Sequence, residues 1–285
     1  MKPRGFVRRL ASRLVSLIVI VLLGGFAAAA LVRYSPGFSS IPEDLDPSIS
    51  PETLRALHAK NEDNNPLPVF FARYLAGTVH GDFGVSSSLN QPVAELLRRR
   101  APVTIKLVAE GTAGGLLLAS LLAWMAVWSR RAYLEAAAFS LSGLLLAVPP
   151  AVLALLFFFN EAPLAIAVSL ALFPRLFGTM RVLLADAYTS PALLAARARG
   201  VSPAAVATRY VLGASTRQLV ALIGVALVLA FGSAIPIEVI CGVPGLGALA
   251  LQAAMARDMP LLCALALIIT FFVTLVHTAG EMVTE

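Results

Sequence analysis

The sequence predicts an all-α, polytopic membrane protein with six transmembrane helices. Of its 285 residues, 59% are hydrophobic and only 13% are charged, and the mean hydropathy is +0.84. Soluble domains are nearer half apolar and a quarter charged, which argues against an ordinary soluble enzyme, a disordered protein or a nucleic-acid-binding module. Six stretches have the roughly 20 mainly apolar residues that a bilayer-spanning helix needs. They are Leu14–Val32, Val103–Trp128, Leu134–Phe159, Leu164–Leu184, Leu219–Ile240 and Leu261–Val283.

The first stretch has a basic flank before it and the alanines Ala27–Ala30 after it, as a signal peptide would. Its apolar run is longer than the roughly 7–15 residues of a signal core, and further spans follow, so we expect a retained helix. The third and fourth stretches are separated only by Asn160–Pro163. These polar and proline residues resist helix continuation and predict a tight hairpin.

Orientation follows from the placement of lysine and arginine in a chain of net charge +6. The basic N-terminus is expected in the cytoplasm, as are Arg130–Arg131 and the arginines of the loop between the fourth and fifth spans. The loop 34–102 then lies outside, and its first part is acidic. Arg98–Arg100 do not fit this pattern, unless an interfacial helix near Pro92–Arg100 lets them reach lipid headgroups. We therefore expect a first helix within 1–33, an external loop 34–102 and a five-helix core 103–285 in the cytoplasmic membrane.

The sequence carries no nucleotide-binding or metal-binding motif. None of its three lysines follows a glycine, so the phosphate-binding loop G-x-x-x-x-G-K-[ST] is absent, and its three histidines lack metal-ligand spacing. Cys241 and Cys263 form no C-x-x-C pair. No cofactor and no catalytic residue are expected. The alternative is an intramembrane hydrolase dyad of Ser233 and His277, but glycine and serine are also common where membrane helices pack closely.

The loop 190–213 is the most informative stretch. It contains Ser-Pro twice, and serine suits the position before a helix while proline suits its first turn. Gly200 and Gly213 stand where helices commonly end. The pattern predicts two short helices, Pro191–Arg199 and Pro203–Leu212, bent at Gly200. Such an element suits a groove on a partner protein; the alternative is a loop that packs only on its own helix ends.

This loop resembles the EAA motif of ABC-importer permeases, in which E-A-A is followed by a glycine and later by I-x-L-P. Ala195, Ala196 and Gly200 match, and Tyr210–Leu212 occupy the I-x-L positions. Leu194 stands in place of the acidic residue, and Gly213 in place of the proline. The run Ala196–Ser202 is similar to a variant found in dipeptide, oligopeptide and nickel permeases.

Other stretches resemble the same family in the same order along the chain. They are Gly81–Ser86 with Gln91–Val93 in the external loop, Arg100–Ile105 at the entry to the second span, Pro149 in the third, and Glu238, Pro244–Gly247 and Arg257–Pro260 after the fifth. The C-terminus lacks the D-P-R-type ending that is usual in the family.

The resemblance implies a type I ABC-importer permease fold and a subunit that transports peptides or similar small polar solutes. Its partners would be a second permease, ATP-binding subunits on which the loop docks, an extracytoplasmic solute-binding protein and membrane lipid, but no nucleic acid. A non-transporting membrane scaffold is the alternative. The residues implied in coupling to the ATPase are Ala195, Ala196, Arg197, Arg199, Gly200, Ser202, Arg209 and Leu212.

Four polar residues in or beside the spans are candidates for the translocation path: Lys106, Glu110, Arg175 and Glu238. Lys106 and Glu110 share a helix face, and the plainer alternative is an interfacial ion pair. Arg175 needs protein or water around it, and could instead bond carbonyls freed beside Pro174. Glu238 could contact the transported solute or gate the outer mouth, or it could instead bind backbone at a helix end.

The residues Pro244, Gly245 and Gly247 predict a turn at the outer mouth. A short helix, Ala248–Ala256, is expected after this turn. It could close the mouth or simply pack in the loop.

Overall fold

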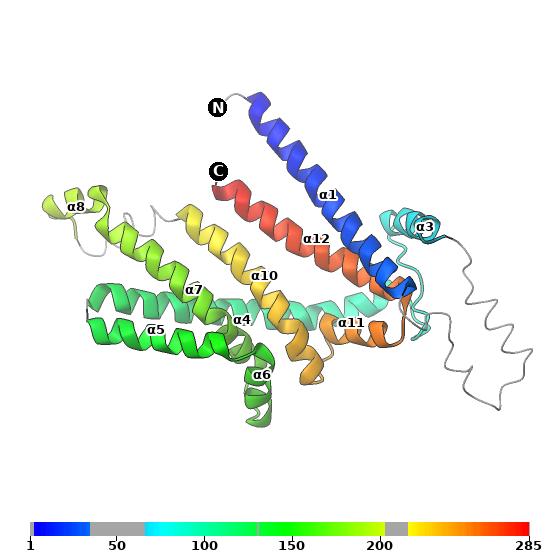
Figure 1. Ribbon diagram of the computed structural model, residues 1–285. Coiled ribbons are helices and arrows are strands. Elements are labelled where there is room, and N and C mark those ends of the chain that lie inside the picture. Colours follow the sequence, from blue (N-terminus) through cyan, green and yellow to red (C-terminus); the bar gives the residue numbers. More distant parts are fainter. Residues whose placement is uncertain (1–2, 35–65, 130, 203–215, 285) are drawn as a thin grey trace, which may run out of the picture. The chain divides into compact units, whose positions relative to one another are not determined.

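The computed structural model describes residues 3–34, 66–129, 131–202 and 216–284. In these ranges the chain is built from helices (Figure 1). Its single strand-like feature there is a bridge between Val85 and Pro92. Five helices are long and apolar enough to cross a membrane, and a bent pair would make a sixth span. The predicted all-α, polytopic fold is therefore confirmed.

The long helices are α1 (Pro3–Arg33), α4 (Val93–Ser129), α7 (Leu164–Thr189), α10 (Thr216–Ile240) and α12 (Met259–Thr284). The shorter ones are α3 (Leu67–Val79), α5 (Ala132–Ala147), α6 (Pro150–Phe159), α8 (Pro191–Ala198) and α11 (Leu246–Met255). The chain divides into one unit of Met1–Arg99 with Leu249–Phe272, and another of Arg100–Ala248 with Val273–Glu285.

The third predicted span is not one helix. The stretch Leu134–Phe159 is divided between α5 and α6, which meet at an angle of 95° (Figure 1). The cause is the sequence Val148-Pro149-Pro150. Each residue before a proline is driven into extended backbone, and Val148 and Pro149 have ψ angles of 120° and 142°. Two successive residues are thereby removed from the helix.

The second predicted span is longer than expected. Instead of a separate interfacial helix near Pro92–Arg100, α4 runs without interruption from Val93 through Pro102 to Ser129, over 37 residues. At 1.5 Å per residue this is about 55 Å, well beyond a hydrocarbon core of about 30 Å. Part of α4 therefore extends out of the bilayer. Arg99 pairs there with Glu95 one turn earlier.

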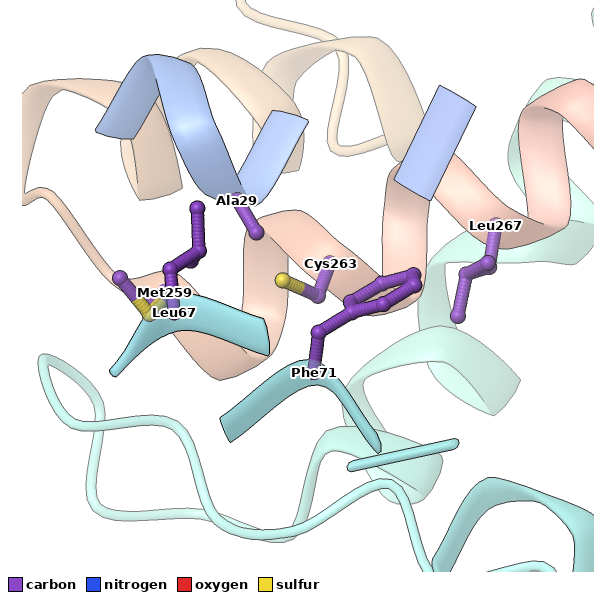
Figure 2. Close-up of a cluster of buried hydrophobic side chains, with 6 residues drawn as sticks. All are labelled: Ala29, Leu67, Phe71, Met259, Cys263 and Leu267. Atoms are coloured by element: carbon purple, nitrogen blue, oxygen red, sulfur yellow. The ribbon is translucent and has the colours of Figure 1, made fainter. Parts of the chain in front are cut away.

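In the first unit, α1 packs against α3. Their apolar side chains form a cluster with the first turns of α12 (Figure 2). The Tyr74 hydroxyl of α3 adds a hydrogen bond of 3.0 Å to the carbonyl of Pro260. The full cluster is Ala29, Leu67, Phe71, Met259, Cys263 and Leu267.

In the second unit, α7 lies at the centre and packs against α5, α6 and α10. Its buried face carries Phe173 and Phe177, stacked 5.4 Å apart, and Phe139 of α5 meets Phe177 edge-on. The Ser169 hydroxyl of α7 donates to the carbonyl of Gly111 in α4 at 3.0 Å. Such small residues let membrane helices approach closely. The exposed residues of α7 on this chain are Ile166, Arg175, Thr179, Val182, Asp186 and Thr189.

Candidate functional site

The short helix α8 follows directly on α7 at Ser190. The Ser190 hydroxyl accepts a hydrogen bond from the Leu193 amide at 3.4 Å, as a helix-capping serine does. Leu193 and Ala196 are fully buried, whereas Leu194 is 56% exposed. One face of α8 is thus fixed on its own chain, and the other offers an apolar side chain outside the spans.

The helix ends as the sequence predicts, at a glycine. Gly200 has a φ of +73°, which is the left-handed conformation that glycine adopts without cost. The Val201 amide then bonds back to the carbonyl of Ala196 at 3.2 Å, a closure typical of helix C-termini.

The residues predicted to couple to an ATPase are distributed over this element and beyond it. Ala195 and Arg199 are exposed, Ala196 is buried, and Arg197 belongs to α8. The Arg199 side chain donates to the carbonyl of Ala195 at 3.1 Å. Ser202 lies just after Gly200. Arg209, Leu212 and the predicted second helix, Pro203–Leu212, lie outside the described residues.

Lys106 and Glu110 form the ion pair that their spacing predicts. Their charged atoms are 3.9 Å apart and both side chains are largely exposed, at 76% and 53%. An ion pair this exposed adds little stability. Both charges therefore remain accessible to another molecule.

Arg175 and Arg181 lie on the same helix, α7, and differ in their surroundings. Arg181 pairs with Glu135 of α5, and its guanidinium lies 5.2 Å from the centre of the Phe139 ring. Arg175 is exposed, although Leu176 and Phe177 beside it are buried. The carbonyl of Pro174 accepts a bond from Ser142, and that of Arg175 from Thr179.

Glu238 is fully buried in α10, and its carboxylate binds backbone and a hydroxyl group. Thr104 of α4 donates to Oε1 at 2.6 Å, and the Gly247 amide donates to Oε2 at 2.7 Å. The Leu246 amide in turn donates to the Thr104 hydroxyl at 2.8 Å. The carboxylate therefore lies at the N-terminus of α11, where the helix dipole favours a negative charge. This arrangement favours the backbone-binding alternative for Glu238.

The turn before α11 is shaped around this carboxylate. Pro244 is exposed, while Gly245 and Gly247 are buried. A Cβ atom on Gly245 would overlap the Glu238 carboxyl group, and one on Gly247 would lie 2.7 Å from the Cα of Ile235. A side chain at position 247 would therefore have to displace backbone, and one at position 245 would have to displace the Glu238 carboxyl group. The helix expected at Ala248–Ala256 is present as α11.

A second buried carboxylate, Asp258, joins two of the family-like segments in the first unit. Ser86 donates to its Oδ2, as do both the amide and the hydroxyl of Ser88, at 2.5, 3.0 and 2.8 Å. The Leu261 amide donates to Oδ1 at 3.2 Å. Burial alone would raise the pKa of Asp258, but these hydrogen bonds outweigh it and hold the pKa below its usual range.

The loop at Ser86 should therefore loosen at low pH. Because the folded-state pKa of Asp258 is lowered, its stabilisation is present above the unfolded value of 3.8 and is lost as pH falls through the folded value. Asp258→Asn should lower the stability of this loop by about 2 kcal/mol at neutral pH. Limited proteolysis at residues 80–92 measures this. The prediction fails if acid and Asp258→Asn leave the cleavage rate unchanged.

The candidate hydrolase dyad is not assembled. The Ser233 hydroxyl donates to the carbonyl of Leu229, one turn earlier in α10, at 2.9 Å. His277 is exposed and lies 3.4 Å from Glu281 on its own helix. Each side chain has a local partner, so the geometry gives no support to a nucleophile and its base.

Thr104, Ser86, Ser88 and Asp258 were not predicted as site residues. Thr104, Ser86 and Asp258 lie within the segments that resemble the permease family, so the sequence contained a signal for their importance. It could not show that Thr104 meets Glu238 across a separation of 134 residues.

The fold and these features define a multi-pass helical membrane protein without an assembled catalytic centre in its described residues. Residues 115–284 match the family of binding-protein-dependent transport system inner membrane components. The chain belongs to this family, which confirms the resemblance to ABC-importer permeases. It is therefore a multi-pass inner-membrane protein of a transport system.

Three relatives cover nearly the whole chain. The dipeptide transport system permease protein of Lactococcus lactis is 29% identical over 90% of this chain and 89% of its own length. A protein of Brucella abortus named for a peptide transport system permease is 26% identical over 87% of each chain. The nickel import system permease protein of Staphylococcus aureus is 23% identical over 98% of this chain and 90% of its own.

Proposed function

We propose that this chain is a permease subunit that moves peptides or similar small polar solutes across the cytoplasmic membrane by alternating access. Energy comes from separate ATPases that dock on the loop 190–213. The observation that carries this proposal is α8, a capped helix that is fixed on one face and exposed on the other. The names of the relatives, which refer to peptide, dipeptide and nickel transport, support the solute class.

The length and surface of α8 suit docking on a partner. Its eight residues span about 12 Å, too short to cross a bilayer. Leu194, which is exposed, provides an apolar anchor for a groove, and Arg199, also exposed, adds a charge just after the end of α8. When two ATPases close on ATP, they would pull this loop and its counterpart together, and hydrolysis would reset them.

The remaining partners follow from alternating access between two permeases. A second, related permease would complete a heterodimer that encloses the path, and a solute-binding protein would deliver the solute to the external loop 34–102. The first segment, 1–33, would begin in the cytoplasm, and 103–285 would form the core. Lys106, Glu110 and Arg175, all exposed on this chain, would line the path, while Glu238 shapes its outer mouth by holding α11.

Affinity purification of this chain from its native membrane should recover an ATP-binding subunit and a second permease. The expected result is ATP-dependent uptake by the purified complex in liposomes. A stable complex without an ATPase would favour the scaffold alternative and would contradict the proposal.

Sidedness is tested with single cysteines at exposed positions. Ala195→Cys in α8 should react with an impermeant thiol reagent only from the cytoplasmic side. Val79→Cys in α3, which is 83% exposed, is the matched control and should react only from outside. Labelling of Ala195→Cys from outside would refute the coupling role of this loop.

A further inference from the structure

Arg175 lies deep in a membrane span. At 1.5 Å per residue it is about 16 Å along the axis from Leu164, the first residue of α7, and about 21 Å from Thr189, the last. Neither end is within easy reach of an arginine side chain. Its charge therefore lies at the level of the hydrocarbon core, where charged side chains face protein or water rather than lipid.

The described part of the chain provides no counter-charge for Arg175. Glu135 pairs with Arg181, and Glu110, although exposed, has its ion-pair partner Lys106 on its own helix. Asp186, the acidic residue of α7 itself, is three turns further along the helix. Arg181 shows that an arginine of α7 can be paired with an acidic residue of the same chain. The exposure of Arg175 is therefore not common to all arginines of this helix.

The residues beside Arg175 on this face of α7 are small or polar. Gly178 lies one turn further on, and a Cβ added there would meet no atom within 4 Å. The Thr179 side chain is exposed and turns its hydroxyl back to the carbonyl of Arg175 at 3.1 Å. The surface at Gly178, one turn from Arg175, is therefore open on this chain.

We propose that Arg175 is an anion-binding point on the solute path, which receives a carboxylate of the transported molecule. This inference rests on the proposed function, because it requires that α7 lines a water-filled path. A guanidinium matches a carboxylate with two parallel hydrogen bonds. A peptide carries such a carboxylate at its C-terminus. A single arginine would therefore bind one end of the solute without contacting the side chains of the peptide.

The test uses Thr179→Cys as a reporter one helical turn from Arg175, in the assembled complex in membrane vesicles. Two impermeant thiol reagents of similar size are compared, the anionic sulfonatoethyl and the cationic trimethylammonioethyl methanethiosulfonate. Native Cys241 and Cys263 are buried. With Arg175 present, the anionic-to-cationic rate ratio should exceed that of a free thiol, and Arg175→Gln should lower this ratio about tenfold or more.

The matched control removes a neutralised pair from the same region. Arg181→Gln together with Glu135→Gln should leave the rate ratio at Thr179→Cys unchanged. Two results would overturn the proposal. Absence of reaction with either reagent would mean that a partner subunit or lipid covers this face. A ratio insensitive to Arg175→Gln would mean that an acidic residue of the partner permease already neutralises the arginine.

Protection by solutes separates this proposal from the proposed function. Dialanine should slow labelling of Thr179→Cys, and dialanine amide, which lacks the carboxylate, should protect at least about tenfold less well. Equal protection by both would refute carboxylate binding. Protection by neither, with the rate ratio still dependent on Arg175, would refute dipeptides as solutes while retaining the anion site.

Discussion

Gly200→Val is expected to reduce ATP-driven uptake about tenfold or more. The φ of +73° at Gly200 costs a residue with a Cβ roughly 1–2 kcal/mol, and a β-branched side chain more. To relieve that strain, the chain must leave α8 in another direction. Each 1.4 kcal/mol lost from docking is a factor of ten in affinity. Co-purification of the ATP-binding subunit and uptake in liposomes measure the effect.

Gly200→Asn is the matched control, because asparagine adopts the left-handed conformation several times more readily than other residues with a side chain. It should retain most of the uptake, with Gly200→Ala between the two. A Cβ at this position meets no atom within 4 Å, so a loss would come from backbone conformation rather than from crowding. A Gly200→Val complex that retains its ATPase and its uptake would refute the coupling role of this element.

The apolar spans could be predicted from sequence because their length and composition suffice to define a membrane helix. Prolines were harder to interpret, since their effect depends on what surrounds them. Pro174 and Pro236 lie inside α7 and α10 without ending either helix, because packing can restore the backbone partner that a single proline removes. Pro149 and Pro150 together produce a bend of 95°. The extended backbone of two adjacent residues leaves no helical bond to restore.

The local features of the candidate site could also be predicted, because they depend on residues that are close together in the sequence. Ser190 and Gly200 act on backbone within a few residues, and their roles at the two ends of α8 were expected. The partners of Glu238 and Asp258 were not, because hydrogen bonds between distant segments depend on how helices pack. A carboxylate beside Pro244–Gly247 indicated a helix end or a gate, and only the structure showed that Thr104 completes the set.

Removing the Glu238 carboxylate should destabilise the protein strongly. Glu238→Ala would leave the Thr104 hydroxyl and the Gly247 amide buried without the acceptor that each now uses. Hydrogen bonds to a charged group are worth about 1.5–3 kcal/mol each, so a loss of at least about 3 kcal/mol is expected. Glu238→Gln retains one acceptor oxygen and should lose less. The midpoint of thermal unfolding of the purified complex, followed by size-exclusion chromatography, measures both.

Gly245→Ala tests the same contact from the other side while leaving every polar group in place. The added methyl group would overlap the Glu238 carboxyl group, so either the carboxylate or the turn must move, and the bond from the Gly247 amide should be lost. Gly232→Ala is the matched control in α10, where a Cβ meets no atom within 4 Å and alanine favours the helix. Gly245→Ala should lower the midpoint of unfolding and Gly232→Ala should not. If the two variants behave alike, the Glu238 carboxylate does not hold α11, and the outer mouth must be shaped by other contacts.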